Sequence, residues 1–89
     1  MLRLPDQPTY IGETYFADSE SETWKLRLMI AWIGDVWEAR VYDLPKHKCV
    51  YAQMFALGSQ AQHEAMLAAN VYLHGRSLGE VEWYRSGNQ

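Results

Sequence analysis

The sequence has one cysteine, three prolines and no long apolar run. The lone Cys49 excludes an internal disulfide, which is typical of proteins from a reducing compartment. Residues 1–5 lack the apolar run of a signal peptide, and the longest apolar stretch covers only residues 28–33, whereas a membrane-spanning helix needs roughly 20 residues. We therefore expect a cytoplasmic protein with no membrane partner.

A strong charge of one sign is also lacking. Eight Lys and Arg stand against eleven Asp and Glu, which gives a net charge of -3. This charge is too weak for a nucleic-acid mimic and has the wrong sign for a strong nucleic-acid binder. Nucleic acid is therefore not the expected partner.

Motifs for catalysis or metal binding are weak. Lys46–Cys49 (KHKC) brings His47 and Cys49 together, but a cysteine nucleophile also needs a base oriented by a third group, and structural zinc usually needs four N or S ligands. His63 and His74 would lie about 16 Å apart along a helix, too far to share a metal.

Two patterns of carboxylates and glycines are equally incomplete. Asp18, Glu20 and Glu22 alternate like calcium ligands, yet the glycine and the distal glutamate of a calcium loop are absent. The glycines are dispersed, so no phosphate-binding loop is present. We predict no catalytic residue, no metal and no cofactor, and hence a protein that is not an enzyme.

Aromatic residues are plentiful. Four Trp, six Tyr and two Phe make up 13% of the chain, and 48% of all residues are hydrophobic, as in folded proteins. A length of 89 residues supports one domain. We expect a single domain over residues 1–89, with residues 1–9 as an extended lead-in and 86–89 as a frayed tail.

The strongest local pattern is AWIGDVW at residues 31–37. Gly34 and Asp35 suit a two-residue hairpin turn, which opposes Ile33 to Val36 and fixes every further pair out to Arg27 with Tyr42. In this register one face is wholly apolar and carries Leu28, Ile30, Trp32, Trp37, Ala39 and Val41. We predict that this face, including both tryptophans, lies in the core beneath a helix.

Four more segments complete the plan. Residues 10–16 predict a first strand, 17–23 a solvated acidic loop, 44–48 a turn and 49–57 a strand that is apolar on both faces. That strand could turn inward either Tyr51, Phe55 and Leu57 or Val50, Ala52, Met54 and Ala56. Residues 80–85 predict a closing strand with Val81 and Trp83 on one side.

A helix is predicted between these last strands. Ser59 and Gln62 have the spacing of a capping box, and Gly75 suits the position after a helix that ends near His74. The inward stripe of this helix consists of Ala61, Ala65, Ala68, Ala69 and Tyr72. Met66 and Leu73 flank the stripe. The fold class is thus α+β, a single antiparallel sheet of four to five strands with one helix on one face, in the order β-β-β-β-α-β.

One helix leaves the second face of such a sheet uncovered. On the hairpin this face mixes apolar, arginine and tyrosine side chains, as protein interfaces do: Arg27, Met29, Ile33, Val36, Glu38, Arg40 and Tyr42. The alternative is that the N-terminal segment or long arginine stems shield its apolar residues. The outward side of the helix adds Leu67 and Val71.

These features favour a small non-enzymatic domain that occupies a surface of a larger protein, as an inhibitor or adaptor, such as the anti-defence or immunity proteins of phages and mobile elements. The alternative protein partner is a second copy of the same chain, which would form a homodimer. The alternative function is a small nucleic-acid-binding or regulatory domain that uses a patch of Arg27, Arg40, Tyr42, Lys46 and Lys48.

Overall fold

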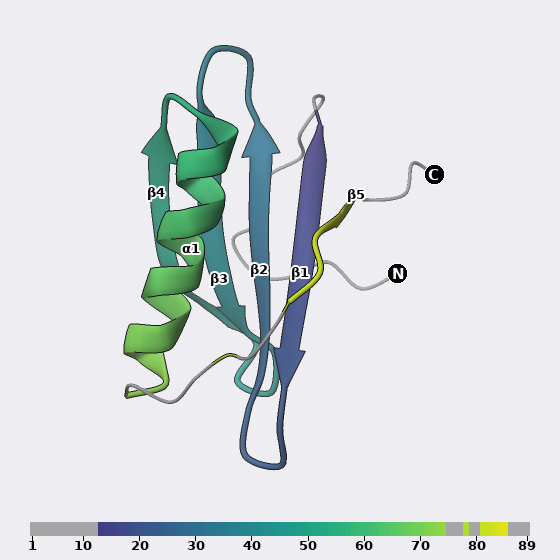
Figure 1. Ribbon diagram of the computed structural model, residues 1–89. Coiled ribbons are helices and arrows are strands. Elements are labelled where there is room, and N and C mark those ends of the chain that lie inside the picture. The colour runs from purple at the N-terminus through teal and green to yellow at the C-terminus, as the bar shows by residue number, and fades with distance from the viewer. Residues whose placement is uncertain (1–12, 75–77, 79–80, 86–89) are drawn as a thin grey trace.

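The computed structural model describes residues 13–74, 78 and 81–85, and the architecture below refers to them. The elements follow one another as β1 (Thr14–Glu20), β2 (Lys25–Trp32), β3 (Trp37–Asp43), β4 (Lys48–Phe55), α1 (Gly58–Tyr72) and β5 (Tyr84–Arg85). The strands form one antiparallel sheet in the order β4-β3-β2-β1-β5, with α1 on one face (Figure 1). The predicted fold class is confirmed, including the order of its elements.

The hairpin between β2 and β3 has the predicted register. Trp32 pairs with Trp37 and Arg27 with Tyr42, and the Ile33 amide donates to the Val36 carbonyl at 3.0 Å. Gly34 has φ +113°, a backbone conformation that side chains rarely permit. The turn therefore fixes which residues face the helix, because a shift by one residue would exchange the two faces.

The predicted first strand and the acidic loop after it are wrong in position. β1 begins at Thr14 and continues through Glu20, so most of the expected loop is strand. Within β1, Ala17 and Ser19 are buried while Asp18 and Glu20 are exposed. Pairing with β2 outweighs the low strand propensity of these polar residues, since it buries Ala17 opposite Leu28.

The helix α1 begins and ends differently from the prediction. Leu57 is the N-cap and no side chain caps the helix, so Ser59 lies inside the first turn and the capping box is absent. At the other end, α1 stops at Tyr72 and His74 has φ 59°, where the sequence suggested Gly75. Gly75 lies outside the described residues.

The core lies between α1 and the sheet. Its buried residues come mainly from the apolar hairpin face and the small stripe of α1: Ala17, Leu26, Leu28, Ile30, Ala39, Val41, Ala61, Ala65 and Ala69, with Leu73 and Leu78. Small side chains let α1 lie close to the sheet. Gly58 lies against Trp37, where an added Cβ would meet the indole ring at 3.1 Å.

The closing strand is shorter than predicted. β5 has two residues, Tyr84 and Arg85, which pair with Phe16 and Tyr15 of β1. Before it, Val81 and Trp83 both pack on the core, which agrees with the prediction that they share one side. The lead-in of residues 1–9 and the tail of 86–89 lie outside the described residues. Among the residues that are described, no helix is long and apolar enough to cross a membrane.

Candidate functional site

The sheet face opposite α1 is less open than the sequence suggested. Met29 and Tyr42 are completely buried there, Glu38 is 7% exposed, and Ile33 and Val36 are half-buried near the hairpin turn. The expectation of an uncovered face is therefore wrong at Met29, Glu38 and Tyr42. That this face binds a partner stays a prediction, which now depends on its less buried members.

The arginines of this face are engaged with carboxylates. Arg27 Nε lies 2.8 Å from Asp18 Oδ1, and this hydrogen bond raises the pKa of the arginine. Arg40 lies 3.2 Å from Glu38 and donates to the Tyr42 hydroxyl at 3.4 Å. Because a phosphate would have to replace these partners, the arrangement does not favour the basic patch of the nucleic-acid alternative.

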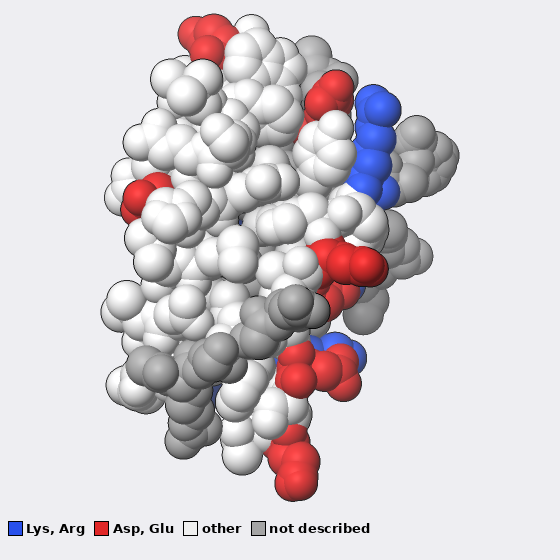
Figure 2. All heavy atoms as spheres, viewed as in Figure 1, with Lys and Arg blue, Asp and Glu red and all other residues white. Residues whose placement is uncertain are grey.

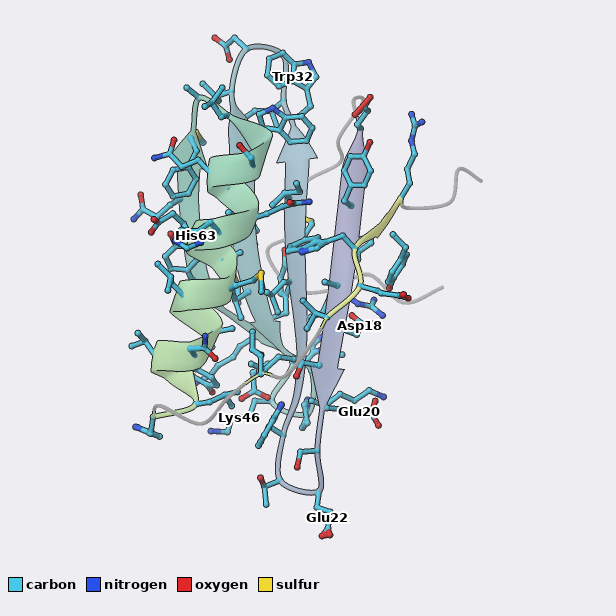
Figure 3. The ribbon with its side chains drawn as sticks, in the orientation of Figure 1. Asp18, Glu20, Glu22, Trp32, Lys46 and His63 are labelled. Carbon is cyan, nitrogen blue, oxygen red and sulfur yellow. The ribbon has the colours of Figure 1, made fainter. Side chains whose placement is uncertain are left out.

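The histidines and Cys49 form no common site in the described part of the chain, where no three His, Cys, Asp or Glu residues form a group that could hold a metal ion. Cys49 is half-buried against the cluster of Met29 and donates to the Tyr51 carbonyl at 3.2 Å. His47 is exposed in the turn before β4, and His63 is exposed on α1 (Figure 3).

The three acidic residues that suggested calcium ligands do not converge. Asp18 and Glu20 lie on the exposed side of β1, and Glu22 lies beyond the strand in the loop to β2 (Figure 3). Asp18 is already engaged, since it also accepts a hydrogen bond from the Tyr84 hydroxyl at 3.1 Å. Its role is to tie β5 to β1.

A groove of about 410 Å³ runs between α1 and β4, which is an edge strand of the described sheet. Its described lining consists of Val50, Tyr51, Glu64, Leu67, Ala68, Val71 and Tyr72. Leu67 is 45% exposed and Val71 is 75% exposed, although both are large and apolar. Large apolar groups that stay in contact with water in a groove are typical of binding sites.

The position of α1 explains the groove. The helix packs mainly on β2 and β3 and less extensively on β4, so the outer strand is only partly covered. Tyr51 and Phe55 of β4 face the helix side, and Val50 packs there too because the bulge beside it interrupts the alternation. Neither of the two inward sets that the sequence offered is therefore correct as a whole. Ala52 and Met54 lie on the opposite face, where Met54 is 58% exposed.

The free edge of β4 has a defined hydrogen-bonding pattern. The bond from the Ile33 amide to the Val36 carbonyl sets the alternation of backbone hydrogen bonds across the sheet. The residues of β3 whose backbone amides and carbonyls point toward β4 are therefore Trp37, Ala39 and Val41. Their partners are Phe55, Gln53 and Tyr51. By the same alternation, the amides of Ala52 and Met54 point away from the sheet and have no partner in it.

Charge is sparse around this groove. The surface over α1 carries few Lys, Arg, Asp or Glu side chains, whereas charged residues gather over β1 and β5 (Figure 2). Among the described lining residues, Glu64 alone is charged. Burial and the nearby Glu64 carboxylate raise the pKa of Tyr51, which stays neutral at physiological pH. A single negative charge therefore marks an otherwise apolar groove.

A second hollow of about 440 Å³ lies at the C-terminal end of α1, where it shares Val71 and Tyr72 with the groove, and is lined in part by Trp24, Asp43 and Lys46. Its buried carboxylate is already used, because Asp43 accepts hydrogen bonds from the Lys46 amide and the Tyr72 hydroxyl. These bonds fix the turn between β3 and β4 and anchor the end of α1. The hollow therefore has a structural explanation.

Comparison of the chain with models of protein families, with curated proteins and with solved structures found no match. The site therefore rests on the geometry of the chain itself. The sequence placed Leu67 and Val71 on the outward side of the helix and apolar residues on both faces of residues 49–57. It did not show that these two segments line one groove. That conclusion required the strand order, which places β4 at the edge of the sheet beside α1.

Proposed function

We propose that the protein is a small non-enzymatic protein-binding domain, an inhibitor or adaptor that occupies a surface of a larger protein. The observation that carries the proposal is the apolar groove between α1 and β4, with the exposed Leu67 and Val71 on its rim. Burying such side chains against a partner removes apolar area from water, which is worth about 25 cal/mol per Å² before the costs of association.

The remaining surface supports this assignment less well. On the hairpin part of the opposite face, Met29, Ile33 and Val36 are partly or wholly buried, and the arginines are held by carboxylates, although Met54 of β4 is exposed there. The groove instead offers exposed apolar groups on a rigid helix and strand, so a partner would not have to displace internal contacts first. This favours the groove over the face that the sequence suggested.

The test uses matched charge insertions on a partner isolated from the source organism by affinity capture. Val71→Asp places a charge in the groove, and we expect the affinity for that partner to fall by about tenfold or more. Ser21→Asp adds the same charge in the exposed loop between β1 and β2 and should leave the affinity unchanged. Titration calorimetry gives the affinities, and circular dichroism verifies the folds.

A third variant separates the two candidate surfaces. Ile33→Asp places a charge near the hairpin turn on the face opposite α1. If Ile33→Asp abolishes binding while Val71→Asp does not, the partner binds the face that the sequence suggested and the groove is not the site.

A further inference from the structure

The edge formed by β4 is regular from Tyr51 to Phe55 and carries few of the devices that usually protect exposed strand edges; a bulge at Val50, between the pairs of Val41 and Tyr42, is confined to the first part of the strand. β4 has eight residues and, among the described strands, pairs with β3 alone. It contains no proline or glycine, and its one charged residue, Lys48, stands at its beginning. Natural edge strands are typically short, charged or interrupted because an unprotected edge pairs with other chains. The β4 edge is therefore competent to accept another strand.

The groove lies where the side chains of an added strand would go. A strand paired to β4 would lie about 4.8 Å beyond it, and every second side chain would point to the face that carries α1. Those side chains would lie beside Tyr51 and under the rim formed by Leu67 and Val71. Backbone bonds to the Ala52 and Met54 amides and burial in the groove would thus occur together.

A second copy of the chain fits this edge poorly. If two copies paired through β4, their helices would lie on the same face about 20 Å apart, since each lies over β2 and β3, whereas packed helices approach to about 8–10 Å. Glu64 lies beside Tyr51 at the middle of β4, so a twofold axis there would bring two carboxylates toward each other. The groove would remain open and gain a repulsion.

We infer that the occupant of the groove is an extended segment of the partner protein, which pairs with β4 as a sixth strand and places a basic side chain beside Glu64. This inference rests on the proposed function and names the form that the partner takes. The argument for the occupant is charge complementarity, because Glu64 is the single charge among the described residues of an apolar groove. Strand addition of this kind uses backbone bonds for affinity and side-chain pockets for specificity.

The probe is a display library of random peptides of about ten residues, selected against the intact protein. We expect enrichment of peptides that alternate β-branched or aromatic residues and carry a Lys or Arg at one fixed position. Selection against Glu64→Lys should replace that basic residue with Asp or Glu. A reversed charge preference would show that the peptide's charged side chain contacts residue 64. Nonspecific binding of apolar peptides does not produce such a reversal.

A second pair of variants tests the backbone. Ala52→Pro removes the outward amide at an exposed position and leaves the neighbouring Tyr51 and Gln53 free to pair with β3. We expect it to weaken binding of the selected peptides by about tenfold or more. Ala52→Thr keeps the amide and should bind them as the natural chain does.

Three outcomes would overturn the inference: peptides enriched with helical spacing, indifference to Ala52→Pro, or a dimer in sedimentation that Ala52→Pro dissociates. The first would indicate that a partner helix fills the groove, and the last that a second copy does. If the captured partner responds to Val71→Asp while no strand-like peptide is selected, the proposed function stands and the strand inference fails. If the partner ignores Val71→Asp, the proposed site fails as well.

Discussion

At one edge of the sheet β4 runs for eight residues beside a groove, and at the other edge β5 has two residues and follows a segment that packs into the core. The β5 edge is held by specific contacts. Ser19 Oγ donates to the Leu78 carbonyl at 3.2 Å, and Asn70 Oδ1 accepts from the Leu78 amide at 3.1 Å. Both backbone groups of residue 78 are thus bound by side chains from β1 and α1.

Charged residues add to this closure. Asp18 on β1 binds Arg27 of β2 and accepts a hydrogen bond from Tyr84 of β5, so one carboxylate joins three strands. β4 has no comparable arrangement among the described contacts, and its outer face carries the exposed Met54 instead. The difference shows that the chain has the means to close an edge and uses them on one side. The openness of β4 is therefore a local property of this edge, not a general consequence of small size.

The largest expected effect on the closed edge comes from Ser19→Ala. The substitution removes the bond to the Leu78 carbonyl and the hydroxyl that accepts from Trp24 Nε1 at 3.3 Å. Because these groups are buried or partly buried, we expect the free energy of unfolding to fall by about 1–2 kcal/mol in urea titrations.

Ser59→Ala is the matched control for that variant. Ser59 is exposed in the first turn of α1 and caps nothing, so its replacement should leave stability unchanged or slightly raised. An equal loss in both variants would show that Ser19 does not hold the closed edge.

A smaller effect is expected for Asp18→Asn. The ion pair with Arg27 is about one-third exposed on both sides, so its loss should cost about 0.5 kcal/mol, and less in high salt. Glu20→Gln serves as the control, because Glu20 lies 4.0 Å from Lys25 with both side chains well exposed. A larger loss of unfolding free energy for Asp18→Asn than for Ser19→Ala would contradict the expected order of the two effects.

The hairpin shows how much of the fold the sequence contains. Gly34 allows the turn, the two-residue loop fixes the register, and alternation then packs Trp37 against the core. The prediction that Trp32 also lies in the core is wrong, because Trp32 is half-buried beside the turn and is not among the core residues. The stripe of small residues on α1 was equally readable, because Ala61, Ala65 and Ala69 recur at helical spacing. Local turn chemistry and periodicity were sufficient in both cases.

Other features depend on contacts between distant segments. The predicted position of β1 was wrong because Asp18, Ser19 and Glu20 have low strand propensity, and only pairing with β2 stabilises them as a strand. Their alternation, with Ser19 buried and its neighbours exposed, was the available signal. The burial of Met29 and Tyr42 could not be read from the hairpin alone, since alternation gives the face of a residue and not what covers it.

Amide hydrogen exchange at β4 tests the central claim most directly. In the isolated protein, the amides of Ala52 and Met54 should exchange rapidly while that of Gln53, which points to β3, is protected. In the complex with the captured partner, Ala52 and Met54 should become protected together. Unchanged rapid exchange at both residues in the complex would contradict the account, because a partner strand at this edge must bond to those amides.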